Sequence, residues 1–548
     1  MTDKTDIVVI GGGQSGLVAA HEAVLRGRNV IVLDQEGPQS LGGQAFWSLG
    51  GLFMIDTPEQ RRMGIRDSRD LAEQDWLGSA GFDRPEDAMP RRWAKAYLDF
   101  AAGPMRDYLQ GVGMRWFPVV GWAERGGGAA DGHGNSVPRF HITWGTGEGV
   151  IAPFVRLAKE AEGAGKLRFA FRHRVTELIE TNGAVTGVRG DVLVEDVARR
   201  GASTRRDIAG TFEIEAENVI IASGGIGGDH HKVRALWPTD RLGPPPVKMV
   251  SGVPDYVDGH MQQIAKLAGA GAINEDRMWH YTEGVKNWDA IWPNHGIRIL
   301  PGPSSMWFDA NGDRLEAPCL PGFDTLSTLR RILSTGHSHS WFVLTQKIIE
   351  KEFALSGSEQ NSDLTSGKWS AVLKERLGKG ATHAVEAFKA HGEDFVVAQD
   401  LETLVAGMSE ITPQTPLEVS HLRAQIAARD AQLNNPFAKD AQIIAIRQAR
   451  AYRGDKLIRT AKPHAILDAQ NGPLIAVRLN ILTRKSLGGL HTDMTGRVLR
   501  QDGTLFEGLY AVGEVAGFGG GGYHGYNALE GTFLGGCIFS GRVAGQNA

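Results

Sequence analysis

Residues 6–16, Asp-Ile-Val-Val-Ile-Gly-Gly-Gly-Gln-Ser-Gly, decide the fold of this chain. The apolar run at their start is typical of a strand buried on both faces. It leads into Gly11, Gly13 and Gly16, spaced as Gly-x-Gly-x-x-Gly, and a helical stretch over 17–26 follows. In this context Gly11 makes the tight turn, Gly13 lets backbone N–H groups approach a pyrophosphate, and Gly16 lets the helix pack close to the strand.

A second strand over 30–33 ends on Asp34, about where a dinucleotide-binding unit places an acid. The Asp34 carboxylate would accept hydrogen bonds from ribose hydroxyls. The positive end of the helix dipole would favour the pyrophosphate. We therefore predict a dinucleotide site that also includes Gln14, Ser15 and Gln35.

A second glycine-rich loop, residues 42–51, distinguishes FAD from NAD as the dinucleotide. A plain NAD-binding domain has no need for it, whereas in a flavin enzyme such a loop wraps the ribityl chain and the isoalloxazine, where backbone must come close. The loop contains no His, so we expect FAD to be bound without a covalent link. The residues predicted to bind FAD here are Gly42, Gly43, Gln44, Ser48, Gly50 and Gly51.

Two later segments fit the same cofactor. A strand over 217–222 precedes a Ser-Gly-Gly turn, and a strand near 508–512 ends in Gly-Glu. A helix-like run over 528–544 then follows, and its N-terminus could direct partial positive charge at the flavin pyrimidine ring. The FAD-binding residues predicted from these segments are Ala222, Ser223, Gly224, Gly513, Glu514, Phe533 and Leu534.

These segments, in this order, resemble the fumarate reductase/succinate dehydrogenase flavoprotein superfamily. The closest resemblance is to its 3-ketosteroid Δ1-dehydrogenase-like branch and the FAD-binding dehydrogenases beside it. The resemblance implies a discontinuous FAD domain with a cap domain inserted after the Ser-Gly-Gly segment, and an active site between the two. The residues that carry it are 9–13, 42–43, 223–225, 487–489 and 509–514.

The sequence is consistent with that layout. We expect an α/β fold in which residues 1–228 and 485–548 form a discontinuous Rossmann-like FAD-binding domain with a parallel sheet. Short alternating strands over 166–220, with a turn signal at 180–183, predict a β-meander inside it. Residues 229–484 contain amphipathic helical stretches and no second strand followed by Gly-x-Gly-x-x-Gly. They are predicted to form an inserted α+β cap.

The resemblance also implies a reaction, the dehydrogenation of a CH–CH bond next to a carbonyl in a cyclic, steroid-like ketone. Donors polarise the carbonyl, a base removes the acidified proton, and the flavin takes hydride. The family's donors are a Tyr hydroxyl and a backbone N–H from the C-terminal loop, near Tyr526 and Gly531 here. Tyr523 and Tyr281 are further candidates. Simple packing of Tyr526 is the structural alternative.

Two alternative functions follow from the same superfamily. In its fumarate-reducing members, the C-terminal loop carries a substrate-binding Arg where this chain has Ala528. They also have a His where Lys485 stands. Both differences count against a small dicarboxylate, although Arg447, Arg450, Arg453 and Arg478 could still reach the site. The other alternative is an electron-transfer subunit of a larger complex. Those subunits usually attach FAD to a His in the first glycine loop, which this chain lacks.

Tryptophans are frequent in the predicted cap, and they either line an apolar pocket for a flat substrate or form its core. The tryptophans concerned are Trp279, Trp288, Trp292, Trp307 and Trp341.

Composition excludes several classes of function. The net charge of −4 indicates neither nucleic acid nor an anionic membrane as a partner. Cys319 and Cys537 cannot form a disulfide framework or a redox-active dithiol, and His337 and His339 have no nearby partners for a metal site. No leader or membrane-spanning run is recognisable. We expect a cytoplasmic enzyme with an apolar ketone or enone substrate, an external electron acceptor and no metal. The sequence leaves the oligomeric state open.

Overall fold

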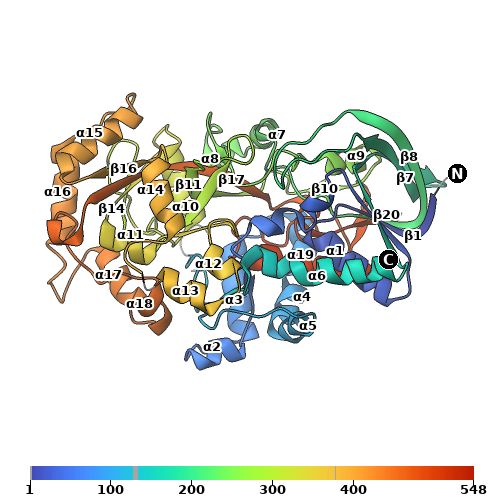
Figure 1. Cartoon of the computed structure of the whole chain (residues 1–548), viewed down its shortest axis with the longest axis horizontal. Coiled ribbons are helices and arrows are strands. Elements are labelled where there is room, and N and C mark those ends of the chain that lie inside the picture. Colours follow the sequence, from blue (N-terminus) through green and yellow to red (C-terminus); the bar gives the residue numbers. More distant parts are fainter. Residues whose placement is uncertain (1–2, 127–133, 377) are drawn as a thin grey trace.

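The computed structural model describes residues 3–126, 134–376 and 378–548. It contains two eight-stranded sheets, which lie at opposite ends of the long axis of the molecule (Figure 1). Two short two-stranded sheets accompany them: β3 (Gly51–Phe53) with β4 (Phe140–Ile142), and β10 (Ala272–Ile273) with β18 (Gly489–Leu490).

The first sheet contains the nucleotide-binding unit predicted from the sequence. Its five central neighbours, β20-β8-β1-β2-β5, run parallel, which confirms the α/β class. Val9 pairs with both Val32 and Ile220, so the middle of the sheet is apolar. The strands are β1 (Asp3–Ile10), β2 (Val30–Asp34), β5 (Leu167–Phe171), β6 (His173–Thr181), β7 (Ala184–Leu193), β8 (Ile208–Ile221), β19 (Arg497–Leu499) and β20 (Leu505–Ala511).

A β-meander extends this sheet. β6 pairs with β7, and β7 pairs with β8, all antiparallel. The turn between β6 and β7 has positive φ at both Asn182 (53°) and Gly183 (83°). Asn and Gly tolerate this conformation, which matches the twist of the flanking strands. The turn signal read at 180–183 therefore marks a real hairpin.

The second sheet is assembled from residues between 250 and 486. Its central strand, β17, pairs with β9, β11, β14 and β16. The strands are β9 (Val250–Ser251), β11 (Met278–Lys286), β12 (Gly296–Leu300), β13 (Met306–Asp309), β14 (His339–Thr345), β15 (Ala354–Leu355), β16 (Phe395–Ala398) and β17 (Leu474–Ser486). The two sheets thus use different parts of the chain, but the division into an FAD-binding domain and a cap stays a prediction.

Helices cover both sheets. One face of the first sheet packs against α1, α6 and α19, and α9 packs against the other. The helices are α1 (Gln14–Leu25), α2 (Pro58–Arg62), α3 (Arg69–Ala80), α4 (Ala88–Ala102), α5 (Met105–Gly111), α6 (Thr146–Gly163), α7 (His230–Ala235), α8 (Thr239–Leu242), α9 (His260–Leu267), α10 (Thr325–Leu333), α11 (Gln346–Glu352), α12 (Ser362–Thr365), α13 (Trp369–Arg376), α14 (His383–His391), α15 (Leu401–Ile411), α16 (Val419–Asp430), α17 (Ala441–Ala449), α18 (Arg453–Ile458) and α19 (Thr532–Asn547).

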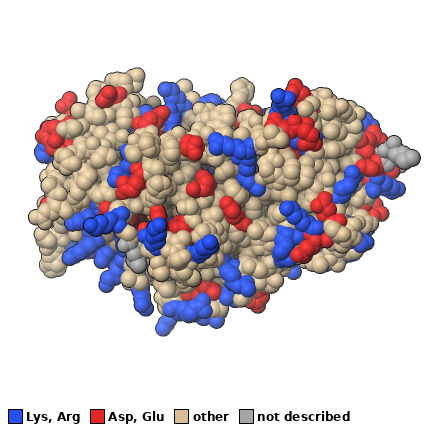
Figure 2. Space-filling model, in the orientation of Figure 1, with Lys and Arg blue, Asp and Glu red and all other residues tan. Residues whose placement is uncertain are grey.

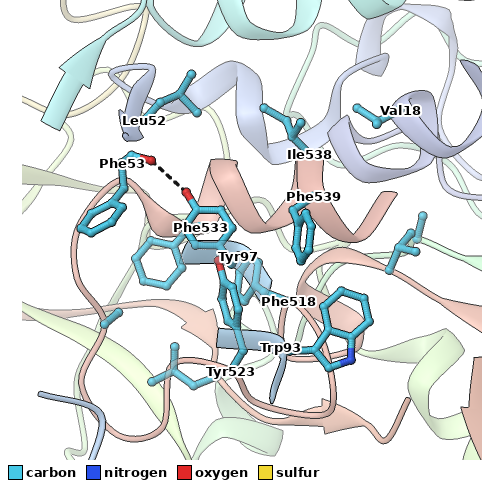
Figure 3. Packing of buried hydrophobic residues seen from close by; sticks show 14 of the residues in the cluster. Val18, Leu52, Phe53, Trp93, Tyr97, Phe518, Tyr523, Phe533, Ile538 and Phe539 are labelled. Atoms are coloured by element: carbon cyan, nitrogen blue, oxygen red, sulfur yellow. Dashed lines mark hydrogen bonds between the residues drawn. The ribbon is translucent and has the colours of Figure 1, made fainter. Parts of the chain in front are cut away.

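The first and last helices of the chain pack side by side. A Cβ on Gly541 would meet the Ser15 carbonyl oxygen at 2.5 Å, and one on Gly545 would overlap the Ala19 carbonyl oxygen. α19 begins four residues later than the sequence suggested, because Gly531 has a left-handed φ of 92°. In Figure 3, Ile538 of α19 points toward Val18 of α1, whereas Phe533 and Phe539 pack among buried aromatic residues that include Tyr97 and Phe518.

Charges of both signs are interspersed over the face shown in Figure 2, which agrees with the small net charge. Across the described ranges, no helix is both long enough and apolar enough to cross a bilayer.

The close approach of α1 to β1 yields a stability prediction. A Cβ on Gly16 would overlap the Gly11 carbonyl oxygen, whereas one on Gly163, near the end of α6, would meet nothing within 4 Å. We expect Gly16→Ala to lower the free energy of unfolding by about 1–3 kcal/mol through overpacking and to reduce bound FAD. Gly163→Ala should leave both unchanged or raise stability slightly. Urea unfolding and flavin absorbance measure the two effects, and equal stability of the two variants would contradict this account.

Candidate active site

One cavity runs from the glycine loop after β1 to the face of the second sheet. Gly11 and Gly13 line it where α1 begins, and Gly13 is the residue that caps α1. Both amide atoms of the Gln14 side chain are buried without a hydrogen-bond partner among the described residues. Since buried polar atoms are rarely left unpaired, this loop fits a polar ligand that would satisfy them.

Asp34, at the end of β2, faces the same cavity. Its carboxylate accepts hydrogen bonds from the backbone N–H groups of Gly12 (2.8 Å) and Glu36 (2.9 Å). Burial raises the pKa of Asp34 to about 6, because the charged form is poorly solvated there. Hydroxyl donors from a ribose would stabilise the ionised carboxylate and lower that pKa, as the dinucleotide prediction requires.

The second glycine loop forms another wall. Gln44 donates a hydrogen bond to Glu514 (Nε2 to Oε2, 3.1 Å) and accepts one from Lys485 (Nζ to Oε1, 3.0 Å). Lys485 Nζ also lies 3.6 Å from the Glu514 carboxylate. Burial lowers the pKa of Lys485, although the nearby carboxylate opposes this. Lys485 is therefore held by Gln44 and Glu514, with all three side chains at the cavity wall.

The N-terminus of α19 completes the cofactor part of the cavity. Gly531, Phe533 and Leu534 line it, and the free N–H groups of the first helical turn carry partial positive charge. This is the arrangement expected beside a flavin ring that becomes anionic on reduction. Together the glycine loops, Asp34 and this helix end fit FAD.

The opposite wall comes from the second sheet. Tyr281 on β11 and Arg298 on β12 line it together with Glu530, which precedes α19. The Tyr281 hydroxyl makes no hydrogen bond with the described residues, and burial raises its pKa above the ordinary tyrosine value. Arg298 donates to Glu530 (Nη1 to Oε1, 2.6 Å), and its guanidinium carbon lies 3.8 Å from the centre of the Tyr281 ring. The cavity thus brings a neutral phenol and a buried ion pair to the space beyond the cofactor site.

Most residues predicted to bind FAD meet at this cavity. The residues that line it are Gly11, Gly13, Gln14, Ser15, Asp34, Gln35, Gly43, Gln44, Ser48, Gly51, Ala222, Ser223, Gly224, Glu514, Phe533 and Leu534. Gly16, Gly42, Gly50 and Gly513 do not line it. These glycines allow close packing around the cavity. For example, a Cβ on Gly513 (φ 70°) would lie 2.5 Å from the side-chain oxygen of Ser15.

Of the four candidate catalytic residues, Tyr281 and Gly531 lie at the cavity and the other two do not. The Tyr526 hydroxyl donates to Asp83 (2.9 Å), and its ring packs on the guanidinium of Arg277, 3.9 Å from the ring centre. Tyr523 is fully buried beside Tyr97 (Figure 3) and Trp76. Its hydroxyl donates to the Thr532 carbonyl oxygen (2.6 Å). Tyr526 therefore links the C-terminal loop to the segment after α3, and Tyr523 belongs to the core.

The remaining candidates lie away from the cavity. Trp279, Trp292, Trp307 and Trp341 are buried but line no part of it, and Trp288 is exposed. Arg447, Arg450, Arg453 and Arg478 do not reach it either, and Ala528 is buried beside it without lining it. No cluster of His, Cys, Asp or Glu suited to a metal occurs within the described ranges.

Several cavity residues were not identified from the sequence. Val175 and His260 line the part near β6 and α9, and Arg484, Arg298 and Glu530 line the far part. Arg298 could have been identified from the sequence, because it interrupts the apolar strand Gly-Ile-Arg-Ile-Leu at 296–300. A charge in such a strand must be paired when it is buried.

Comparison with known proteins identifies the family of this chain. The family model described as an FAD binding domain matches residues 6–534. A KsdD-like steroid dehydrogenase of Mycobacterium tuberculosis strain H37Rv is 58% identical over 543 residues, which cover 99% of this chain and 95% of that protein. The KsdD-like steroid dehydrogenase of Mycolicibacterium smegmatis is 58% identical over 529 residues, 96% of each chain. The chain belongs to the FAD-binding KsdD-like steroid dehydrogenase family.

The fold agrees with that membership. The structure of 3-ketosteroid Δ1-dehydrogenase from Sterolibacterium denitrificans covers 99% of this chain, with a TM-score of 0.66 at 16% identity and 99% of its own chain matched. The structure of 3-ketosteroid Δ4-(5α)-dehydrogenase from Rhodococcus jostii gives a TM-score of 0.63 at 16% identity, over 99% of this chain and 96% of its own. The enzyme is an FAD-dependent oxidoreductase, and both the α/β fold and the FAD cofactor expected from the sequence are confirmed.

The raised pKa of Asp34 predicts how FAD affinity depends on pH. Binding to the ionised carboxylate competes with its protonation, so the Kd for FAD should rise as pH falls through about 6, by up to roughly tenfold per pH unit. Fluorescence titration of apoprotein with FAD measures this. Asp34→Asn should bind FAD more weakly and with little pH dependence. A parent Kd that stays constant between about pH 5 and 8 would contradict this role for Asp34.

Proposed function

We propose that this enzyme removes two hydrogens from adjacent carbons beside the carbonyl of a cyclic, steroid-like ketone. The observation that carries the proposal is the unpartnered Tyr281 phenol, which lines the same cavity as the FAD loops. The names of the mycobacterial relatives support a steroid as substrate. We further propose that the second sheet and its helices are an inserted cap, so that the substrate lies between the cap and FAD.

Tyr281 is proposed as a hydrogen-bond donor to the substrate carbonyl. Its raised pKa keeps the phenol protonated, so it can donate but is a poor base at neutral pH. The Gly531 N–H, at the start of α19, is proposed as the second donor. Two donors aimed at the oxygen where charge develops would acidify the neighbouring C–H bond. FAD, when bound, supplies the hydride acceptor.

The charges in the cavity favour a neutral substrate over a dicarboxylate. Arg298 is paired with Glu530, Lys485 is held by Glu514, and Arg484 donates to the Trp47 carbonyl oxygen (2.9 Å). A dianion would have to displace these partners or leave them unpaired, which is costly in a buried site. Reduction of a conjugated alkene stays the alternative because the same flavin chemistry runs in either direction. An electron-transfer subunit is the second alternative.

The proposal includes an external electron acceptor and a cytoplasmic setting. Cys319 and Cys537 are both free thiols, as in proteins of a reducing compartment.

The roles of Tyr281 and Tyr526 as candidate donors can be distinguished by removing one hydroxyl at a time. We expect anaerobic flavin bleaching by a 3-ketosteroid to slow at least ~30-fold in Tyr281→Phe, since one oxyanion-type donor is worth ~10²–10³ in rate. Tyr510→Phe is the matched control, because that hydroxyl bonds the Asn547 carbonyl oxygen away from the cavity. Tyr526→Phe tests the assignment suggested by the family resemblance. Slowing in Tyr526→Phe but not in Tyr281→Phe would transfer the role to Tyr526.

Fumarate should be a negligible substrate. The enzyme has Ala528 and Lys485 where the fumarate-reducing members have Arg and His. Each missing charge-assisted contact should cost ~1.5–3 kcal/mol of transition-state binding. Oxidation of reduced viologen by fumarate measures the activity, and a steroid dienone serves as the positive substrate. Fumarate turnover at ordinary enzyme rates, ~1–1000 per second, would favour the alternative instead.

A further inference from the structure

The part of the cavity beyond the cofactor loops has a largely apolar wall. Leu49, Phe140 and Leu300 line it and pack together in one cluster. A Cβ on Gly531 would lie 3.3 Å from the Phe140 ring, so the segment that carries Glu530 adjoins these side chains. This wall suits the flat, apolar body of a steroid-like ketone. The polar groups that it presents would then decide which ketone fits.

One carboxylate oxygen of Glu530 is such a group. Glu530 is only 8% exposed and lines the cavity. Its Oε1 accepts the 2.6 Å hydrogen bond from Arg298, whereas Oε2 makes no hydrogen bond with a described residue. Oε2 is not fully enclosed by protein, so it is open to the cavity. An ionised carboxylate accepts hydrogen bonds and donates none, so this oxygen favours a ligand that brings a donor.

Arg298 holds this carboxylate in place. Its guanidinium lies against the Tyr281 ring, while Glu124 and Glu283 lie beyond hydrogen-bond distance from it, at 3.6 and 3.8 Å. Of these three carboxylates, only that of Glu530 is bonded directly, and the charge-assisted contact fixes its orientation. An acceptor that is already held in place loses little conformational entropy when a ligand binds.

The cavity therefore presents two unlike polar groups to one ligand. The Tyr281 hydroxyl is the proposed donor to the substrate carbonyl, and Oε2 of Glu530 is an acceptor. Both residues contact Arg298, whose guanidinium carbon lies 3.8 Å from the Tyr281 ring centre and whose Nη1 lies 2.6 Å from Glu530 Oε1. A single molecule that carries a carbonyl and a donor group can satisfy both.

The donor group is better a hydroxyl than an ammonium. Arg298 already pairs with the Glu530 carboxylate, so an ammonium would bring a second cation to the same buried carboxylate. A hydroxyl brings the hydrogen bond without the charge.

We propose that the substrate is a hydroxylated, steroid-like ketone and that Glu530 selects its hydroxyl group. The hydroxyl donates to Oε2 of Glu530 while the ring carbonyl lies at the proposed carbonyl donors. Arg298 is a positioning residue, which orients the carboxylate. The same ketone without the hydroxyl would leave this oxygen buried and unpaired, so the site selects against it. This inference rests on the proposed function.

Matched substrates test the preference directly. One 3-ketosteroid has no hydroxyl group, and a series of its derivatives each carries one hydroxyl at a different ring carbon. We expect at least one derivative to exceed the unsubstituted ketone in kcat/KM by ~10–100-fold, the usual effect of a hydrogen bond to a charged group. Replacing both members of the ion pair, in Arg298→Met/Glu530→Met, should abolish this ratio without leaving a lone charge. The ratio compares two substrates on one variant, so a general loss of activity cancels.

Binding without turnover provides a second readout. With FAD reduced by dithionite, equilibrium dialysis measures the Kd of each steroid. The hydroxyl preference should appear in these Kd values and weaken in Glu530→Gln, which keeps an oxygen for Arg298. Glu283→Gln is the matched control, because Glu283 lies beside Arg298 but does not line the cavity. This control should keep the parent ratio.

Three results would overturn the inference: a parent enzyme that turns over ketosteroids without preferring any hydroxylated derivative, an unchanged ratio in both Glu530 variants, or an equal loss in Glu283→Gln. If no ketosteroid reduces the flavin of the parent enzyme, the proposed function itself fails. A hydroxyl preference in the Kd values that weakens in Glu530→Gln would still support the hydroxyl site in that case.

Discussion

The site depends on backbone segments that approach one another more closely than side chains would allow. Gly16 brings α1 against the Gly11 carbonyl, and Gly541 and Gly545 bring α19 against α1. The first and last helices of the chain are therefore neighbours, and the loops at their N-termini open on one cavity. A phosphate needs backbone N–H groups without intervening side chains, and a flavin needs a helix end beside its ring. The same glycines allow both the backbone contact with a phosphate and the position of the helix end beside a flavin.

A second constraint is the cost of burying charge. Arg298 is almost fully buried on β12, and removing such a cation from water is unfavourable unless a carboxylate pairs with it at close range. The partner, Glu530, comes from the other end of the chain, 232 positions away. The pair thus joins the second sheet to the C-terminal segment of the cofactor site at the cavity wall. Without Glu530, Arg298 would keep only the more distant carboxylates of Glu124 and Glu283, at 3.6 and 3.8 Å.

The sequence predicted the features that depend on local spacing. The glycines at 11, 13 and 16, Asp34 and the Asn182-Gly183 turn each require a particular backbone conformation, so their spacing indicates their structure. The direction of the Tyr526 side chain could not be predicted in this way. It is five residues from Gly531 along the chain, yet its side chain points to Asp83 and Arg277, because the intervening loop turns away from the cavity. Glu530, one residue from Gly531, was not identified, because its ion pair with Arg298 joins side chains 232 positions apart, and local spacing does not reveal such a contact.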